Sequence, residues 1–332
     1  MKHSTKLSAY FLLALSFFTL ENCFISLFPA GSGSSPELKE HVLQEGSKDK
    51  ILIIPVSGVI SEQSSSDFFG FQQESMVSTL KSSFLKAEED EDIKGIILKI
   101  DSPGGTVTAS DIIYKEILKF KNKSGIPVVS LYMDIAASGA YYISMATDHI
   151  MAHPTTVTGS IGVIMSNLNF KEGLDKLGIK DASVTSGPNK SIGSPFKERS
   201  PEQERILQSI VTGLYERFFS IVDKGRPKLT AQQLRPLCDG RVYTANQAKR
   251  LGLVDSIGYF DDMLKYLSSM SEFRRDDPTK EPSVIVYNYQ NGDVQHIYQA
   301  QFTKRPTGME YILKRLSSEA SGPKFMYIWN GN

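Results

Sequence analysis

The chain has 332 residues, with 37 basic and 37 acidic side chains and a formal net charge of zero. This balance leaves no basic excess of the kind that binds nucleic acid, so we expect no nucleic-acid partner. The two cysteines, Cys23 and Cys238, are too few for a disulfide framework. The five histidines form no cluster with cysteine, and no phosphate loop or dinucleotide motif is present. The sequence therefore predicts neither a metal site nor a cofactor.

Residues 1–30 have the pattern of an export segment. Two lysines precede a largely apolar run that extends to about Ala30. A basic flank before an apolar segment predicts that the flank stays in the cytoplasm and that the segment anchors the chain. We expect an uncleaved, single-pass anchor in the cytoplasmic (inner) membrane, with the catalytic domain on the extracytoplasmic side. An apolar core helix remains the alternative, because the run contains a charge. Residues 31–48 are polar and begin Gly/Ser-rich, as expected of a linker.

Strand and helix patterns alternate in the next hundred residues. Helical spacing of apolar residues follows the first two of three aliphatic runs, and in the second helix Thr108 and Asp111 have the spacing of a capping box. This alternation predicts an α/β fold with a mainly parallel sheet that is covered by helices. The three runs, which we interpret as buried strands, are Ile51–Ile60, Ile93–Ile100 and Ile126–Met133.

Two further helices have clear start signals. A long helical pattern covers Ser200–Arg226 and begins with Ser-Pro, a favourable N-cap followed by a proline. A shorter helix is predicted after Thr244, where Gln247 completes a capping box.

The C-terminal residues 271–332 are assigned to an accessory segment. A charged linker precedes an alternating strand pattern at 283–290, and a helical pattern follows at 307–316. No motif in this segment indicates its role.

Ser138 is a candidate nucleophile. It stands among small residues, in Ala136–Ala140, where a predicted strand turns into a helix. A serine hydroxyl needs a base, and no histidine is near it in the sequence; lysine can serve if a dry environment lowers its pKa. Lys190 lies in a Gly/Ser/Pro loop with few charged neighbours and is the candidate base. Taken singly, a packing serine and a surface lysine remain alternatives.

Three glycines and a second serine complete the candidate site. Gly104 and Gly105 follow a buried strand, and Gly139 follows the candidate nucleophile. Their backbone N–H groups are suited to stabilise an oxyanion. Ser160, in a Gly/Thr/Ser turn, has a hydroxyl that is able to orient a neutral lysine amine. Each of these positions also fits an ordinary turn.

Five motifs in order resemble the signal peptide peptidase A family of membrane-bound serine proteases, in its short, single-unit form. The resemblance covers about Ile51 to Tyr266 and implies a Clp protease/crotonase-like spiral of ββα units, here residues 49–270. The motifs are DSPGG, AASGAYYIS, TGSIGVIM, GPNKSIGSPF and GRVYTANQAKRLGLVD.

The resemblance also implies a role for each candidate residue. It implies a homo-oligomer with active sites in an enclosed cavity, and in short forms the catalytic pair is completed across a subunit interface. The expected function is a serine endopeptidase that degrades remnant signal peptides after their release. The implied roles are nucleophile for Ser138, general base for Lys190, lysine orientation for Ser160, and oxyanion donation for Gly105 and Gly139, with Gly104 as the alternative to Gly105.

Two other functions are compatible with the same fold. An acyl-CoA hydratase or isomerase of the crotonase type would use carboxylates; Asp101 and Asp134 are near the candidate site, but no paired glutamates are evident. A membrane scaffold without catalytic activity is the second alternative, and the joint presence of Ser138, Lys190 and Ser160 argues against it.

Overall fold

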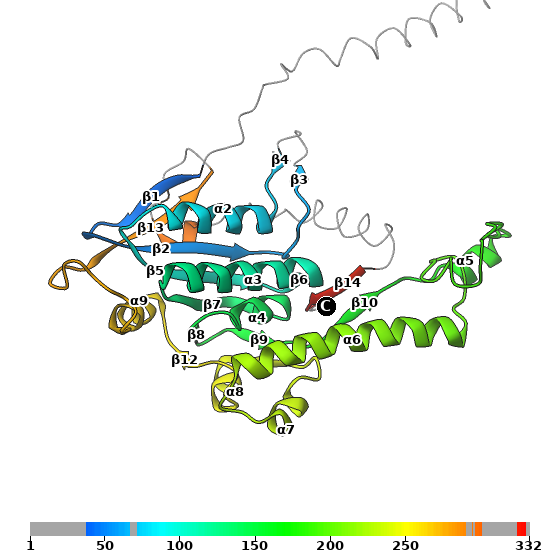
Figure 1. Ribbon diagram of the computed structural model, residues 1–332. Coiled ribbons are helices and arrows are strands. Elements are labelled where there is room, and N and C mark those ends of the chain that lie inside the picture. Colours follow the sequence, from blue (N-terminus) through cyan, green and yellow to red (C-terminus); the bar gives the residue numbers. More distant parts are fainter. Residues whose placement is uncertain (1–37, 67–71, 290–293, 295, 301–323, 330–332) are drawn as a thin grey trace, which may run out of the picture. The chain divides into compact units, whose positions relative to one another are not determined.

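A mostly parallel sheet forms the centre of the structure (Figure 1). The computed structural model describes residues 38–66, 72–289, 294, 296–300 and 324–329. The strand order is β1-β13-β2-β5-β7-β8-β12, β9 pairs with β7, and β11 pairs with β9. Only β1–β13 and β9–β11 are antiparallel among these described pairs. The strands are β1 (Lys39–Gln44), β2 (Ser47–Ser57), β5 (Ile93–Ser102), β7 (Val128–Ala137), β8 (His149–Ala152), β9 (Val157–Gly159), β11 (Val242–Thr244), β12 (Ser256–Ile257) and β13 (Pro282–Asn288).

Two small antiparallel sheets accompany the main one. In the first, β14 (Lys324–Ile328) lies between β6 (Gly104–Thr106) and β10 (Ile164–Ser166). In the second, β3 (Ser65–Ser66) pairs with β4 (Gln72–Gln73). The first of these sheets is important for the site, because β6 contains Gly104 and Gly105, and β10 follows Ser160 by only a few residues.

The central strands are buried on both faces, as their aliphatic sequences predict. In β2, Leu52 and Ile54 belong to one apolar core, whereas Ile51 and Ile53 belong to the other. Helices α2, α3, α4 and α6 contribute to the first core and α9 to the second. The helices are α2 (Met76–Glu88), α3 (Val107–Ser124), α4 (Gly139–Ser144), α5 (Lys171–Lys176), α6 (Pro201–Gly225), α7 (Ala231–Leu234), α8 (Ala245–Arg250) and α9 (Phe260–Ser269), with 3-10 turns η1 (Arg235–Leu237) and η2 (Ile297–Gln299).

The first residues of three helices show whether the capping predictions are correct. The capping box of Thr244 and Gln247 at α8 is confirmed, and so is the start of α6 after Ser200, which also forms a capping box with Gln203. At α3 the prediction is wrong, because the N-cap is Thr106, whose hydroxyl accepts from the Ala109 N–H, and Thr108 lies within the first turn. The helix starts earlier than predicted because Thr106 already has the extended backbone and the side chain that a cap requires.

Segments outside the predicted catalytic region are built into the sheets. The residues expected to form a linker include β1 and the beginning of β2. The C-terminal accessory segment supplies β13, which lies between β1 and β2, and also β14. The predicted anchor at 1–30 and the predicted helix at 307–316 lie outside the described residues. None of the helices in the described part of the chain has the length and apolar character needed to cross a membrane.

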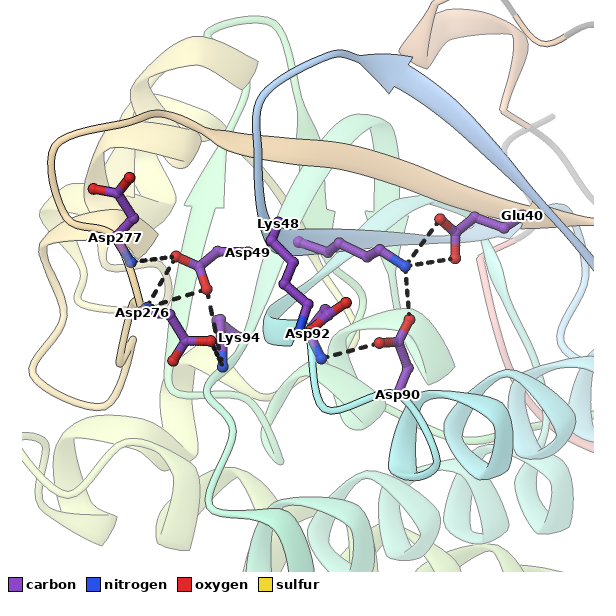
Figure 2. A network of polar contacts seen from close by, with 9 residues as sticks. Glu40, Lys48, Asp49, Asp90, Asp92, Lys94, Asp276 and Asp277 are labelled. Atoms are coloured by element: carbon purple, nitrogen blue, oxygen red, sulfur yellow. Dashed lines mark hydrogen bonds and ion pairs between the residues drawn. The ribbon is translucent and has the colours of Figure 1, made fainter.

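Charged side chains connect the amino ends of β2 and β5 to the loop before β13 (Figure 2). The buried Asp49 carboxylate accepts the backbone N–H groups of Asp276 (3.0 Å) and Asp277 (3.3 Å). Lys94 Nζ lies 3.3 Å from the Asp276 carboxylate, and Lys50 pairs with two further carboxylates. This network is at the amino ends of the parallel strands, whereas Ser138 and the glycines follow their carboxyl ends.

Candidate active site

Ser138 connects β7 to α4 in a strained turn. Its φ of 54° and ψ of −114° are unusual for a non-glycine residue, and such a backbone costs on the order of 1–3 kcal/mol. The Ser138 N–H donates to the Gly159 carbonyl (2.8 Å), and the Ser138 carbonyl accepts from the Tyr142 N–H (2.9 Å). The residue is 1% exposed, and its Oγ has no hydrogen-bond partner among the described residues. An unpaired hydroxyl on a strained strand-to-helix turn is suited to nucleophilic attack.

The glycine backbones of two turns lie against each other beside this serine. A Cβ on Gly104 would lie 2.6 Å from the Gly139 nitrogen, and a Cβ on Gly139 would lie 3.1 Å from the Gly105 nitrogen. A Cβ on Gly105 would lie only 1.9 Å from the Ile60 carbonyl oxygen. Side chains are therefore excluded here, and the close backbone approach brings the amides of Gly105 and Gly139 together as an oxyanion site requires.

The hydrogen bonding of the glycines distinguishes the two candidate donors on this turn. The Gly104 N–H donates to Ser102 Oγ (3.1 Å), and the Gly104 carbonyl accepts from the Ile60 N–H (2.8 Å). Gly104 is thus engaged within its own turn. This bonding favours Gly105 over Gly104 as the partner of Gly139.

Ser160 lies next to Ser138 at the carboxyl ends of two paired strands. Strands β7 and β9 are parallel, and their register pairs Ala137 with Gly159. Ser160 also has a positive φ, 50°, and its N–H donates to the Arg241 carbonyl (2.7 Å). The fold therefore brings the two serines together, although they are far apart in the sequence.

Lys190 lies away from this cluster within one chain. Its side chain is exposed, and its loop docks on the start of α6, where Gln203 Nε2 donates to the Pro188 carbonyl (2.8 Å). The other half of α6 lies beside α4 (Figure 1). The rings of Phe218 and Tyr142 are 5.0 Å apart there. From its first turn to Phe218, α6 rises on the order of 25 Å. A single chain thus does not bring Lys190 to Ser138.

The segment that carries Lys190 exposes many apolar side chains. We call residues 167–200, between β10 and α6, the arm. An exposed apolar surface of this kind marks a contact surface for another molecule. The exposed apolar residues of the arm are Leu168, Phe170, Leu177, Ile179, Val184 and Phe196.

Comparison with known proteins identifies the family. Residues 120–274 match "Peptidase family S49", and residues 62–158 match "Clp protease". A protein of Enterococcus faecium named as a signal peptide peptidase is 42% identical over 237 residues, which cover 70% of this chain and 67% of that protein. A protein of Synechocystis named as a protease is 37% identical over 215 residues, which cover 64% of this chain and 76% of that protein. The chain belongs to peptidase family S49.

This S49 member is therefore a serine protease, which excludes the hydratase and the scaffold alternatives. The Clp protease match confirms the predicted Clp protease/crotonase-like α/β fold. Protease 4 of Salmonella typhi is also similar, 35% identical over 210 residues, which cover 62% of this chain and 34% of that protein. The roles of the individual site residues stay predictions.

A partly exposed ion pair between Asp111 of α3 and Arg217 of α6 also involves α4 of the S49 domain. Asp111, on α3, accepts hydrogen bonds from the Tyr142 hydroxyl and from Arg217 Nη2 (2.7 Å). Burial alone would raise the pKa of Asp111, but the hydrogen bonds from Tyr142 and Arg217 outweigh it and hold that pKa below its ordinary value. The carboxylate thereby joins α3 and α6 to α4, the helix that follows the nucleophile turn.

One element of the site was not predicted from the sequence. Strand β14 pairs with β6, the strand that contains Gly105, and places Tyr327 opposite this glycine. The available signal was the apolar run Phe325–Trp329, which includes the only tryptophan of the chain. An apolar run of five residues predicts neither its partner strands nor its place beside a distant motif.

Proposed function

We propose that this serine protease is a membrane-anchored endopeptidase that degrades remnant signal peptides. Residues 1–30 hold it in the cytoplasmic (inner) membrane, with the catalytic domain on the extracytoplasmic side. The basic flank before an apolar segment supports this placement. The name of the Enterococcus faecium relative supports the substrate. Released signal peptides are apolar and partition into lipid, so a protease held at the membrane meets them there.

In the proposed mechanism, Ser138 Oγ attacks the carbonyl carbon of the peptide bond while neutral Lys190 Nζ takes its proton. The N–H groups of Gly105 and Gly139 stabilise the oxyanion. Lys190 then gives the proton to the leaving amine, and the C–N bond breaks. In the second half, Lys190 takes a proton from water, which hydrolyses the ester on Ser138 and restores the free hydroxyl. Ser160 orients the lysine amine.

The proposed active enzyme is a homo-oligomer in which Lys190 of one copy serves Ser138 of its neighbour. The separation along α6 and the exposed apolar surface of the arm support this arrangement. Contact with a second copy would cover that surface and make the environment of the amine dry. Because the arm and the nucleophile turn are different surfaces, the contact is heterologous, and its repetition closes a ring around an enclosed space.

The observation that carries this proposal is the unpaired Ser138 hydroxyl beside two glycine amides. The test uses the full chain in detergent and a synthetic signal-peptide remnant with a fluorophore and a quencher. Ser138→Ala and Lys190→Ala should each lower kcat by about 10³-fold or more. Lys180→Ala, which removes another exposed lysine of the arm, is the matched control and should retain activity. Full activity of either catalytic variant would refute the mechanism.

The membrane placement has its own test. Deletion of residues 1–30 should move the protein from the membrane fraction to the soluble fraction, and added protease should digest the full chain in intact spheroplasts. Retention of the deleted form in the membrane, or protection in spheroplasts, would contradict the proposed topology.

A further inference from the structure

Strand β7 changes its neighbour shortly before the nucleophile turn. Its first half pairs with β8, and its end, from Ile135 onward, pairs with β9 (Figure 1). On its other edge, successive pairs with β5 are made by Tyr132 and Ala136, and β7 has two residues more than β5 in this interval. The ladders of the described residues are therefore interrupted at 133–134. An interruption of this kind bends a strand and redirects the residues that follow it.

Two threonines of the β9 segment bind the β7 backbone at this interruption and beyond it. Thr156 Oγ1 donates to the Met133 carbonyl (2.5 Å), and Thr158 Oγ1 donates to the Ala136 carbonyl (2.6 Å). Both threonines are fully buried. They are two positions apart, and Ser160, the residue expected to orient the lysine, follows at the same spacing. The last part of β7 thus depends on hydroxyl groups as well as on backbone pairing.

The second threonine and the residue after it hold the nucleophile turn at two points. Thr158 binds the Ala136 carbonyl, and Gly159 accepts the Ser138 N–H (2.8 Å). These two bonds lie on either side of Ala137, so they fix the backbone from the Ala136 carbonyl to the Ser138 nitrogen. The Ser138 φ of 54° is unfavourable for a non-glycine residue, and such a backbone persists only where its surroundings hold it. The Thr158 hydroxyl supplies one of the two bonds that do so.

Thr158 is itself fixed in place. Its register pairs it with Ala136 of β7 on one side and with Tyr243 of β11 on the other. Two residues further along, the Ser160 N–H donates to the Arg241 carbonyl (2.7 Å), which continues the contact with the β11 side. A buried side chain on a strand that is paired along both edges has little freedom, so its hydroxyl is a rigid donor for the Ala136 carbonyl.

Packing alone does not account for a threonine at this position. Valine has nearly the same shape without the hydroxyl, and burial of a polar group is costly unless the group is hydrogen-bonded. Without the hydroxyl, the buried Ala136 carbonyl loses this donor, and its peptide group is free to turn toward another one. A contribution to stability applies to Thr156 as well as to Thr158. An effect on catalysis is specific to Thr158, because its acceptor residue is two positions before Ser138.

We propose that Thr158 is a positioning residue of this protease, whose hydroxyl holds the Ala136 carbonyl and thereby fixes the direction of Ser138 Oγ toward the reacting carbonyl. This inference rests on the proposed function, since it takes Ser138 as the nucleophile. In this role Thr158 does not touch the substrate, so its loss lowers kcat and leaves KM unchanged. A displacement of about 1 Å at a reacting group lowers the rate by about 10²-fold, which sets the scale of the expected effect.

The experiment uses the full chain in detergent with two substrates, the quenched signal-peptide remnant and fluorescently labelled casein. Thr158→Val should lower kcat by about 10- to 100-fold, with KM unchanged within about twofold. Thr158→Ser keeps the hydroxyl and should retain kcat within about threefold. Thr156→Val is the matched control, since Thr156 is equally buried and also donates to a β7 carbonyl. It should lower the thermal midpoint about as much as Thr158→Val does, yet retain kcat within about threefold.

Near-ultraviolet circular dichroism verifies that Thr158→Val is folded. If it is not, Thr158→Cys takes its place, because a thiol fits a buried site and is a weak donor; it should lower kcat by about threefold or more. An unchanged kcat in the variant used, or equal losses of kcat at positions 158 and 156, would overturn the inference.

The two substrates separate this inference from the proposed function. Cleavage of casein but not of the remnant by the unsubstituted chain would refute the proposed substrate, and the Thr158 variants are then compared on casein. Full activity of Ser138→Ala would overturn the mechanism and the inference together. Loss of activity in Ser138→Ala with full activity in Thr158→Val would overturn the inference alone.

Discussion

Coexpression of Ser138→Ala and Lys190→Ala chains should restore protease activity that neither variant has alone. Each variant lacks one half of the catalytic pair. If the lysine comes from a neighbouring copy, a Lys190→Ala chain supplies the serine and an adjacent Ser138→Ala chain supplies the lysine. Proton transfer requires the two groups within about 3 Å, whereas within one chain the Lys190 loop docks on the first turn of α6, on the order of 25 Å along this helix from the Phe218 contact with α4.

The expected magnitude follows from random assembly. In an equal mixture of the two variants, an interface is complete only when its serine side belongs to a Lys190→Ala chain and its lysine side to a Ser138→Ala chain. For a heterologous contact this occurs at about a quarter of the interfaces, because each side is correct about half of the time. We therefore expect about a quarter of the unsubstituted activity. Unsubstituted chain coexpressed with an equal amount of Ser138→Ala should keep about half of the activity whether or not the subunits mix, so this mixture shows that an inactive subunit leaves its neighbours active.

The assay is cleavage of the quenched signal-peptide remnant by oligomers that carry different affinity tags on the two chains. Tandem purification isolates mixed oligomers, and mass spectrometry gives their ratio. If mixed oligomers are as inactive as either variant alone, while the control mixture keeps half of its activity, the lysine does not come from a neighbour and the reasoning from the α6 geometry is refuted.

Three further predictions concern single positions. Ser160→Ala should lower kcat by about 10- to 100-fold with little change in KM, because the hydroxyl positions the lysine amine rather than the substrate; an unchanged kcat would contradict the role. Gly105→Ala should lower both the thermal midpoint and kcat, the latter by about 10²- to 10³-fold, since a Cβ there meets a backbone carbonyl at 1.9 Å. Its control, Gly125→Ala, has nothing within 4 Å of the added Cβ and, unlike Gly105, a positive φ of 69°; it should keep its activity. Asp111→Asn should lower the thermal midpoint at neutral pH. The pKa of Asp111 is lower in the folded state than in the unfolded chain, so the ionised carboxylate stabilises the folded state above its ordinary pKa of about 3.9. This stabilisation is lost as pH falls through the lower folded-state pKa. Thermal melts of both forms across pH 3–7 check this, and a difference that stays constant below about pH 4 would contradict it.

Much of the fold was evident from the sequence because its signals are local. The aliphatic run at Ile51–Ile60 predicted a strand buried on both faces, and β2 is such a strand. The capping residue Ser200 predicted the start of α6, since a cap acts within one turn. Capping also shows the limit of prediction from local sequence. Two threonines near the start of α3 are both suitable N-cap residues, and the extended backbone at Thr106 decides that this residue is the N-cap.

Only part of the arrangement of the candidate site could be predicted from the sequence. Ser138, Ser160, Gly105 and Gly139 stand where parallel strands end, and the order of the strands brings them together. The position of Lys190 depends instead on the direction of α6, which no local pattern specifies, although the pattern at Ser200–Arg226 predicted the length of this helix.

The sequence alone determined the alternation of strands and helices, the parallel sheet and the family motifs, because these depend on residues close together in the chain. Only the tertiary structure decided that β13 enters the sheet between β1 and β2, and that β14 lies beside Gly105. Strand pairing is made by backbone groups that every sequence shares, so a short apolar segment specifies that it will be buried but not which strands it will join. Tyr327 and Gly105 are more than two hundred positions apart, and only the folded chain brings them together.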